Sequence, residues 1–208
     1  MFQFLIGAFV LIGIYALIPK RFTSVADVSR QNGYSRKENM LITAYVGAVS
    51  LVMTMLVGMI FYWIGSGVLS SNRAMMEVVS PLVLIITGII YLGIHVKGDL
   101  QEKSRINMEA VKDKEKEYVI GYILRREFLV PNVMLGAYCF LAAFFRLTGL
   151  VLILIMYFIV GLAGICFLAD MYYRGNEKIK FNVLAAHNEE IMGAILMGLG
   201  IFFYFTGL

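Results

Sequence analysis

Charged residues are scarce in this chain: only 15% of its 208 residues are Asp, Glu, Lys or Arg, while 60% are hydrophobic. Soluble domains have about 25% charged and about 45–50% apolar residues. The composition therefore excludes an ordinary soluble domain, a disordered chain and a nucleic-acid-binding module. We expect an integral membrane protein whose length is divided into spans of about 20 mostly apolar residues.

Cysteine and recognisable catalytic motifs are also lacking. The two cysteines, Cys139 and Cys166, both lie inside apolar stretches, so the sequence predicts neither a disulfide framework nor a Cys-x-x-Cys zinc site. The chain contains no phosphate-binding glycine loop and no His-Glu-x-x-His zinc motif. We therefore expect no catalytic residue, no cofactor and no metal site, and we interpret the protein as a non-enzyme.

Six apolar stretches, separated by polar segments, predict six transmembrane helices in a single polytopic domain, residues 1–208. A bilayer offers backbone groups no hydrogen-bond partner, so α-helices are the expected form. The first stretch is followed by Lys20 and Arg21 and not by a small-residue cleavage site, so we expect a retained helix and not a signal peptide. The predicted spans are residues 2–18, 40–64, 81–96, 128–145, 147–169 and 191–208.

Capping signals mark two of the predicted helix starts. Ser35 and Glu38 form a capping-box pattern before the second span. Ser80 precedes Pro81, which predicts a helix start at Pro81 for the third span. This third span is short, and the residues 75–79 offer a way to lengthen it at its start.

The positions of the cationic residues predict the orientation. Sixteen of the 18 Lys and Arg residues lie in the first, third and fifth loops, whereas the second and fourth loops hold only Arg73 and Arg146. Cytoplasmic loops carry the excess of Lys and Arg. We therefore expect a plasma-membrane protein with both termini outside, built from three helical hairpins closed on the cytoplasmic side.

Two of the predicted cytoplasmic loops carry segments that suit a membrane surface. The first loop has apolar residues at Phe22, Val25 and Val28 and ends at Asn32–Gly33. The third loop is charged, with helical propensity, and then becomes aromatic and aliphatic over residues 118–126. We interpret these as a solvated helical linker and interfacial segments.

A weak internal similarity links three of the spans. Gly13, Gly88 and Gly164 each begin a Gly-Ile segment that ends in an aromatic residue, at spacings of 75 and 76 residues. Parallel repeats of this kind occur in transporters. The same combination also arises by chance in apolar sequence, so both interpretations stay open.

Candidate functional residues gather near the predicted cytoplasmic ends of the spans: His95, Asp170, His187, Glu189 and Glu190. Histidine and carboxylate side chains together could bind a divalent metal. The favoured explanation is structural, because His187 or Asn188 can cap the last helix while the glutamates complement its positive N-terminal dipole. That explanation does not require other helices to converge.

Inside the spans the polar residues are Ser50, Thr54 and Thr87, with Thr43 nearer an end. Such hydroxyls usually bond to the backbone of their own helix. Small residues four apart predict faces for close helix packing, either within the chain or against a second copy or a partner. These pairs are Ala44 with Ala48 and Ala194 with Gly198, the latter flanked by Gly193 and Gly200.

Three functions are open at this point. The favoured hypothesis is a non-catalytic protein that packs against a membrane-protein partner, as a subunit of a membrane complex or as an immunity-type protein. This hypothesis is favoured because ionisable residues inside spans are typical of ion-coupled proteins, and this chain has almost none there. The alternatives are a small-solute or ion transporter or channel, and a membrane enzyme that uses His187 and Glu190.

Overall fold

The structure is a computed structural model that describes residues 2–16, 19–96, 111–112, 114–125, 133–175 and 188–206. Over these residues the chain is helical and contains no strand, which confirms the all-α class. The elements are α1 Phe2–Ala16, α2 Pro19–Gln31, α3 Arg36–Ser71, α4 Arg73–Val96, α6 Lys116–Ile123, α7 Val133–Ala142, the 3₁₀ turn η3 Ala143–Phe145, α8 Arg146–Tyr173 and α10 Asn188–Thr206.

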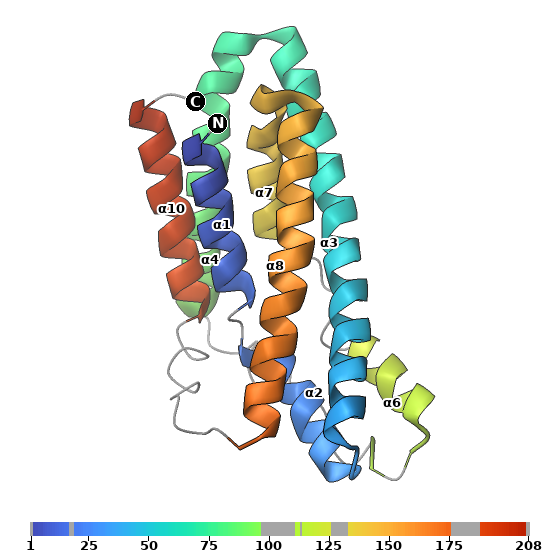
Figure 1. The fold of residues 1–208 in the computed structure, drawn as a ribbon. Helices are drawn as coiled ribbons and strands as arrows, with labels where there is room; N and C mark the ends of the chain where they lie inside the picture. Colours follow the sequence, from blue (N-terminus) through green and yellow to red (C-terminus); the bar gives the residue numbers. More distant parts are fainter. Residues whose placement is uncertain are drawn as a thin grey trace.

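The long helices run alongside one another, and α2 and α6 lie at one end of the resulting bundle (Figure 1). Helix α4 packs on α10, α3 packs on α7 and α8, and α1 contacts both α8 and α10. The start of α1, the end of α10 and the α3–α4 and α7–α8 connections lie at the opposite end, which we call the turn end (Figure 1). The end with α2 and α6 is called the polar end.

Three helical stretches in the described residues are long and apolar enough to cross a membrane: Arg36–Ser71, Arg73–Gly93 and Met134–Tyr173. The third of these contains the chain reversal between α7 and α8 (Figure 1). Two shorter apolar helices cover Phe4–Gly13 and Glu190–Thr206. The described residues therefore form a helical protein with three candidate membrane-spanning helices, which agrees with the expected membrane class, whereas the six predicted spans and their hairpin arrangement stay a prediction.

Helix α3 begins at the predicted capping box. Ser35 Oγ accepts a hydrogen bond from the Glu38 amide, and the Glu38 carboxylate accepts one from the Ser35 amide. The helix has 36 residues and is about 54 Å long at 1.5 Å per residue. Its exposed large apolar side chains run from Leu41 to Ile64, about 35 Å, which is close to the roughly 30 Å of a hydrocarbon core.

The helix start predicted at Pro81 is wrong, whereas the lengthening of this span through residues 75–79 is confirmed. Helix α4 begins at Arg73, and Pro81 lies inside it. Asn72 ends α3 with an extended backbone, and its Oδ1 accepts a hydrogen bond from the Met75 amide at 3.1 Å, so one residue both ends α3 and starts α4. The early start is stabilised by Met76, which is fully buried against Phe140 and Ala143 at the turn end.

The α7–α8 connection is equally short. The 3₁₀ turn η3 follows α7 directly, and Arg146 has a φ of 57°. This left-handed backbone conformation is uncommon for a residue with a Cβ, and it reverses the chain so that α8 starts at once. The predicted boundary between the fourth and fifth spans, at residues 145–147, coincides with this turn.

Glycines set the contact between α4 and α10. A Cβ added to Gly200 would lie 2.8 Å from the carbonyl oxygen of Pro81, and one added to Gly193 would lie 2.7 Å from that of Gly88. The small-residue face predicted at Ala194 and Gly198 is not the one used. Ala194 is exposed and Gly198 has open space beside it, because the flanking glycines face α4 instead.

Among the described residues, the two largest apolar clusters stabilise the bundle. The larger core lies among the long helices and includes Phe4, Tyr138 and Ile153. The smaller core joins α2, the start of α3 and α6 at the polar end, with Val25, Val28, Ile42, Val46, Val111, Val119 and Ile123 as its buried members. The smaller core holds α2 and α6 against the bundle.

Candidate functional site

Of the five predicted candidate residues, Asp170 and Glu190 have described side chains. Asp170 lies in the last turn of α8 at the polar end, and Glu190 lies in the first turn of α10. His95 belongs to α4 and Glu189 to α10, but only their backbone is described. His187 lies outside the described residues. Because α10 begins at Asn188, both glutamates occupy its first turn, where a negative charge is favourable.

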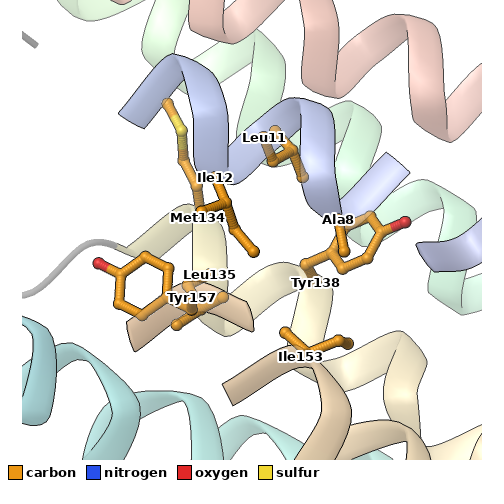
Figure 2. A pocket seen from close by; sticks show the side chains of 8 residues that line it. All are labelled: Ala8, Leu11, Ile12, Met134, Leu135, Tyr138, Ile153 and Tyr157. Carbon is orange, nitrogen blue, oxygen red and sulfur yellow. The ribbon is translucent and has the colours of Figure 1, made fainter. Parts of the chain in front are cut away.

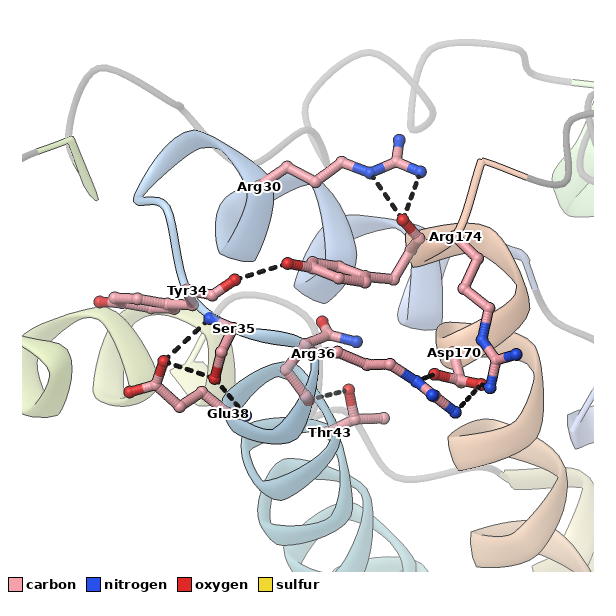
Figure 3. A network of polar contacts seen from close by, with 10 residues as sticks. Arg30, Tyr34, Ser35, Arg36, Glu38, Thr43, Asp170 and Arg174 are labelled. Carbon is pink, nitrogen blue, oxygen red and sulfur yellow. Dashed lines mark hydrogen bonds and ion pairs between the residues drawn. The ribbon is translucent and has the colours of Figure 1, made fainter.

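Asp170 binds two arginines. Its carboxylate accepts hydrogen bonds from Arg36 Nε at 2.6 Å and Arg36 Nη2 at 3.1 Å, and it contacts Arg174 Nη2 at 2.6 Å. The side chain of Asp170 is 14% exposed, whereas those of Arg36 and Arg174 are 57% and 51% exposed. This cluster joins the start of α3 to the end of α8 and carries one net positive charge (Figure 3).

Arg30, near the end of α2, binds the C-terminus of α8. Its guanidinium donates to the carbonyl oxygens of Tyr172 and Tyr173, the latter at 3.0 Å from Nη2. The same guanidinium lies 5.1 Å from the centre of the Tyr172 ring. The last carbonyls of a helix have no partner within the helix, and a cation there complements the helix dipole. Arg30 therefore fixes α2 to α8.

The α2–α3 connection is bonded to α8 and α6. Gly33 has a φ of 66°, which suits the turn that the Asn32–Gly33 pair predicts. Tyr173 donates its hydroxyl to the carbonyl oxygen of Tyr34 (Figure 3). Lys116 of α6 donates to Glu38 Oε1 at 2.8 Å and lies 5.5 Å from the centre of the Tyr34 ring. Contacts from two helices, α6 and α8, thus converge on this connection.

The α2 face that packs on the bundle also holds polar groups. Burial raises the pKa of the Asp27 carboxyl above its ordinary value, and this effect exceeds the lowering by a hydrogen bond from Tyr172 and by the charge of Arg30. Ser29 Oγ on α2 and both side-chain amide atoms of Asn39 on α3 are buried without a hydrogen-bond partner among the described residues. The polar end is therefore ionic on its surface and polar in part of its interior.

The described side chains include no group of three or more His, Cys, Asp or Glu that could hold a metal. Asp170 faces arginines and Glu38 faces a lysine, so each of these carboxylates is neutralised by a cation of the protein. In this part of the chain these ion pairs join α3 to α8 and to α6.

A small, mostly apolar cavity lies inside the described part of the bundle. It lies among α1, α7 and α8 and has a volume of about 10 Å³, which is roughly the space that one water molecule requires. Figure 2 shows its lining, which is Ala8, Leu11, Ile12, Met134, Leu135, Tyr138, Ile153 and Tyr157. Tyr138 donates its hydroxyl to the carbonyl oxygen of Phe4 at 2.6 Å, which connects α7 to α1.

The hydroxyls inside the long helices bond to their own backbone, as predicted. Thr43 donates to the Asn39 carbonyl oxygen at 2.8 Å, Thr54 to that of Ser50 at 3.0 Å and Thr87 to that of Val83 at 2.6 Å. Each pair is four residues apart. These hydroxyls therefore satisfy carbonyls of the same helix.

The sequence pointed to Asp170 but not to its partners. From the sequence, Arg36, Arg174, Arg30 and Lys116 indicate only the orientation of the chain in the membrane. One signal was available: Asp170 and Arg174 are four residues apart, a spacing that places opposite charges together on a helix. The pairing of Arg36 with Asp170 joins residues 134 positions apart, and it depends on the packing of α3 against α8.

No protein-family model, no curated protein and no solved structure matches this chain.

Proposed function

We propose that the protein is a multi-pass plasma-membrane protein that acts by packing its helices against a membrane-protein partner, and not by catalysis. The partner would be another subunit of a membrane complex, or a toxin in the case of an immunity-type protein. In this proposal α1, α3, α4, α7, α8 and α10 are the six crossings, the polar end is cytoplasmic and both termini lie outside.

The arrangement of the chain ends and connections supports this topology. Asn72 and Arg146 mark connections at the turn end, near the start of α1 and the end of α10 (Figure 1). The described cationic side chains at the turn end are those of Arg73 and Arg146. The Lys- and Arg-rich first loop contains α2, which lies at the polar end, and α8 ends there before the fifth loop (Figure 1); a cytoplasmic polar end would agree with the positive-inside rule.

The contrast between a small, mostly apolar cavity and an exposed apolar outer surface, both seen in the described residues, is the observation that carries the functional part of the proposal. The cavity among α1, α7 and α8 has a volume of only about 10 Å³, and its lining is mostly apolar. The hydroxyls of Thr54 and Thr87 are turned onto their own helices. The outer surface, in contrast, carries large exposed side chains such as Trp63, which is 78% exposed. A function exerted through that surface fits these features.

A crosslinking experiment tests the proposal. A photo-crosslinking amino acid replaces Trp63 on α3, Phe167 on α8 or Phe205 on α10, all exposed, and crosslinked partners are identified after irradiation of intact membranes. We expect one protein to be captured in stoichiometric amount from one of these faces. Lipid adducts alone at all three positions would contradict the proposal.

Two further measurements separate the alternatives. Flux of an ion or solute through the purified protein in liposomes would favour the transporter and contradict the proposal. The Glu190→Gln variant should capture the same partner as the wild type, because Glu190 acts in this proposal only as a charge in the first turn of α10. If this variant still folds but no longer captures the partner, Glu190 has a functional role and not only a structural one.

A further inference from the structure

We propose that the Arg36–Asp170–Arg174 cluster binds the phosphate group of anionic phospholipids at the polar end of the bundle. The inference rests on the proposed membrane topology. It assigns a ligand to a site that the partner-binding function does not use.

The charges of the cluster leave it able to bind an anion. Two guanidinium groups share one carboxylate, and the oxygens of that carboxylate are already bonded at 2.6–3.1 Å. Asp170 is mostly buried, but both arginines are about half exposed. Each guanidinium has five N–H donors in a planar fork that matches phosphate. The exposed portions of Arg36 and Arg174 therefore present donors and one net positive charge outward.

The depth of the cluster matches that of lipid phosphates. The first large apolar side chain exposed on α3 is Leu41, and the last one on α8 is Phe167. Arg36 lies five residues before Leu41, about 7.5 Å along the helix, and Asp170 lies three residues after Phe167, about 4.5 Å. The headgroup layer extends roughly 5–7.5 Å beyond the hydrocarbon core on each side. The guanidinium groups thus lie in the headgroup layer if Leu41 and Phe167 mark the edge of the core.

Neighbouring side chains favour the same assignment. Tyr172 and Tyr173 flank the cluster at the end of α8, and tyrosine is enriched at membrane interfaces. Arg30 is already bonded to the carbonyl oxygens of these two residues, so it complements the helix C-terminus. Arg36 and Arg174, in contrast, keep exposed guanidinium groups that can bind a lipid phosphate.

Lipid binding by the purified full-length protein tests the inference. Native mass spectrometry in detergent measures the affinity for phosphatidylglycerol and for phosphatidylcholine with the same acyl chains. We expect the wild type to prefer phosphatidylglycerol. The double variant Arg36→Gln/Arg174→Gln should bind it more weakly by about fivefold for each arginine removed. The matched control is Arg73→Gln, which removes a cation at the turn end and should leave the affinity unchanged.

Three outcomes would overturn the inference. These are equal affinity for the two lipids, unchanged affinity in the double variant, and displacement of the lipid by inorganic phosphate at equal concentration. The last outcome would assign the site to a free anion. If the double variant unfolds, Arg174→Gln alone gives the same test, because it leaves the Arg36–Asp170 pair intact.

Failure of this inference and failure of the proposed function give different results. Captured partner without lipid selectivity contradicts the lipid site alone. Lipid selectivity that depends on Arg36 and Arg174, without a captured partner, contradicts the partner-binding function alone.

Discussion

Gly88 of α4 and Gly193 of α10 lie directly against each other. A Cβ added to Gly88 would lie 2.6 Å from the carbonyl oxygen of Gly193, and one added to Gly193 would lie 2.7 Å from that of Gly88. Real Cβ atoms do not approach a carbonyl oxygen so closely, so only glycine allows the two backbones to meet at this distance. Small residues at helix crossings have this role in membranes, where the hydrophobic effect does not drive helices together.

Substitution of Gly193 by Ala should therefore separate the two helices. We expect Gly193→Ala to lower the free energy of unfolding by about 1–3 kcal/mol, the usual cost of overpacking. Gly198→Ala is the matched control, because it lies on the same helix beside open space and should change stability by less than about 0.5 kcal/mol. Thermal unfolding in detergent measures both, and equal stability of the two variants would contradict the described α4–α10 contact.

Asp170 should matter more to stability than other paired carboxylates. We expect Asp170→Asn to destabilise the protein by about 1–2 kcal/mol, because it weakens bonds to two arginines whose exposure partly screens them. Glu77 pairs with Arg73 at the turn end at 3.3 Å, and both are more than half exposed. Glu77→Gln should therefore cost less than about 0.5 kcal/mol. Denaturant titration compares them, and an equal effect of the two substitutions would count against the cluster.

The raised pKa of Asp27 predicts how the stability of the folded protein depends on pH. Burial raises the pKa of its carboxyl in the folded protein above the ordinary value of 3.8, so the folded state holds this proton more tightly than the unfolded state. The contribution of Asp27 to stability is then complete below pH 3.8 and is lost as the pH rises through the raised pKa.

The Asp27→Asn variant isolates this effect. At neutral pH it should be more stable than the wild type, because it removes a charge from a partly buried site, and its advantage should shrink as the pH falls. Unfolding temperatures of both proteins measured across this range give the difference directly. An advantage that grows on acidification would show that the pKa of Asp27 is lowered in the folded protein.

The sequence predicted the helical class and several local signals correctly. Ser35 and Glu38 form the expected capping box, and the chain turns at Arg146, where the fourth and fifth spans were separated. These features depend on residues close together in the sequence. Local hydrogen bonds and the scarcity of charge determine these features, so the sequence pattern alone is sufficient to predict them.

The features that depend on packing were not predicted. Pro81 looked like a helix start, but Asn72 begins α4 earlier and the burial of Met76 holds that first part of the helix. The choice of Gly193 over Gly198 for the α4 contact depends on which face of α10 meets α4. The partnership of Arg36 with Asp170 likewise depends on how α3 packs on α8. Neither the glycine contact nor the Arg36–Asp170 pairing leaves a periodic signal in the sequence.

The proposed placement of the two bundle ends on opposite sides of the membrane is best tested by labelling of introduced cysteines. Ser71→Cys at the turn end and Gln31→Cys at the polar end each introduce an exposed thiol, and the unmodified protein, whose Cys139 is buried and Cys166 half-buried, is the control. Intact cells are treated with a membrane-impermeant maleimide. We expect labelling of Ser71→Cys in intact cells and of Gln31→Cys only after the membrane is permeabilised. Labelling of Gln31→Cys in intact cells, with Ser71→Cys protected, would contradict the proposed orientation.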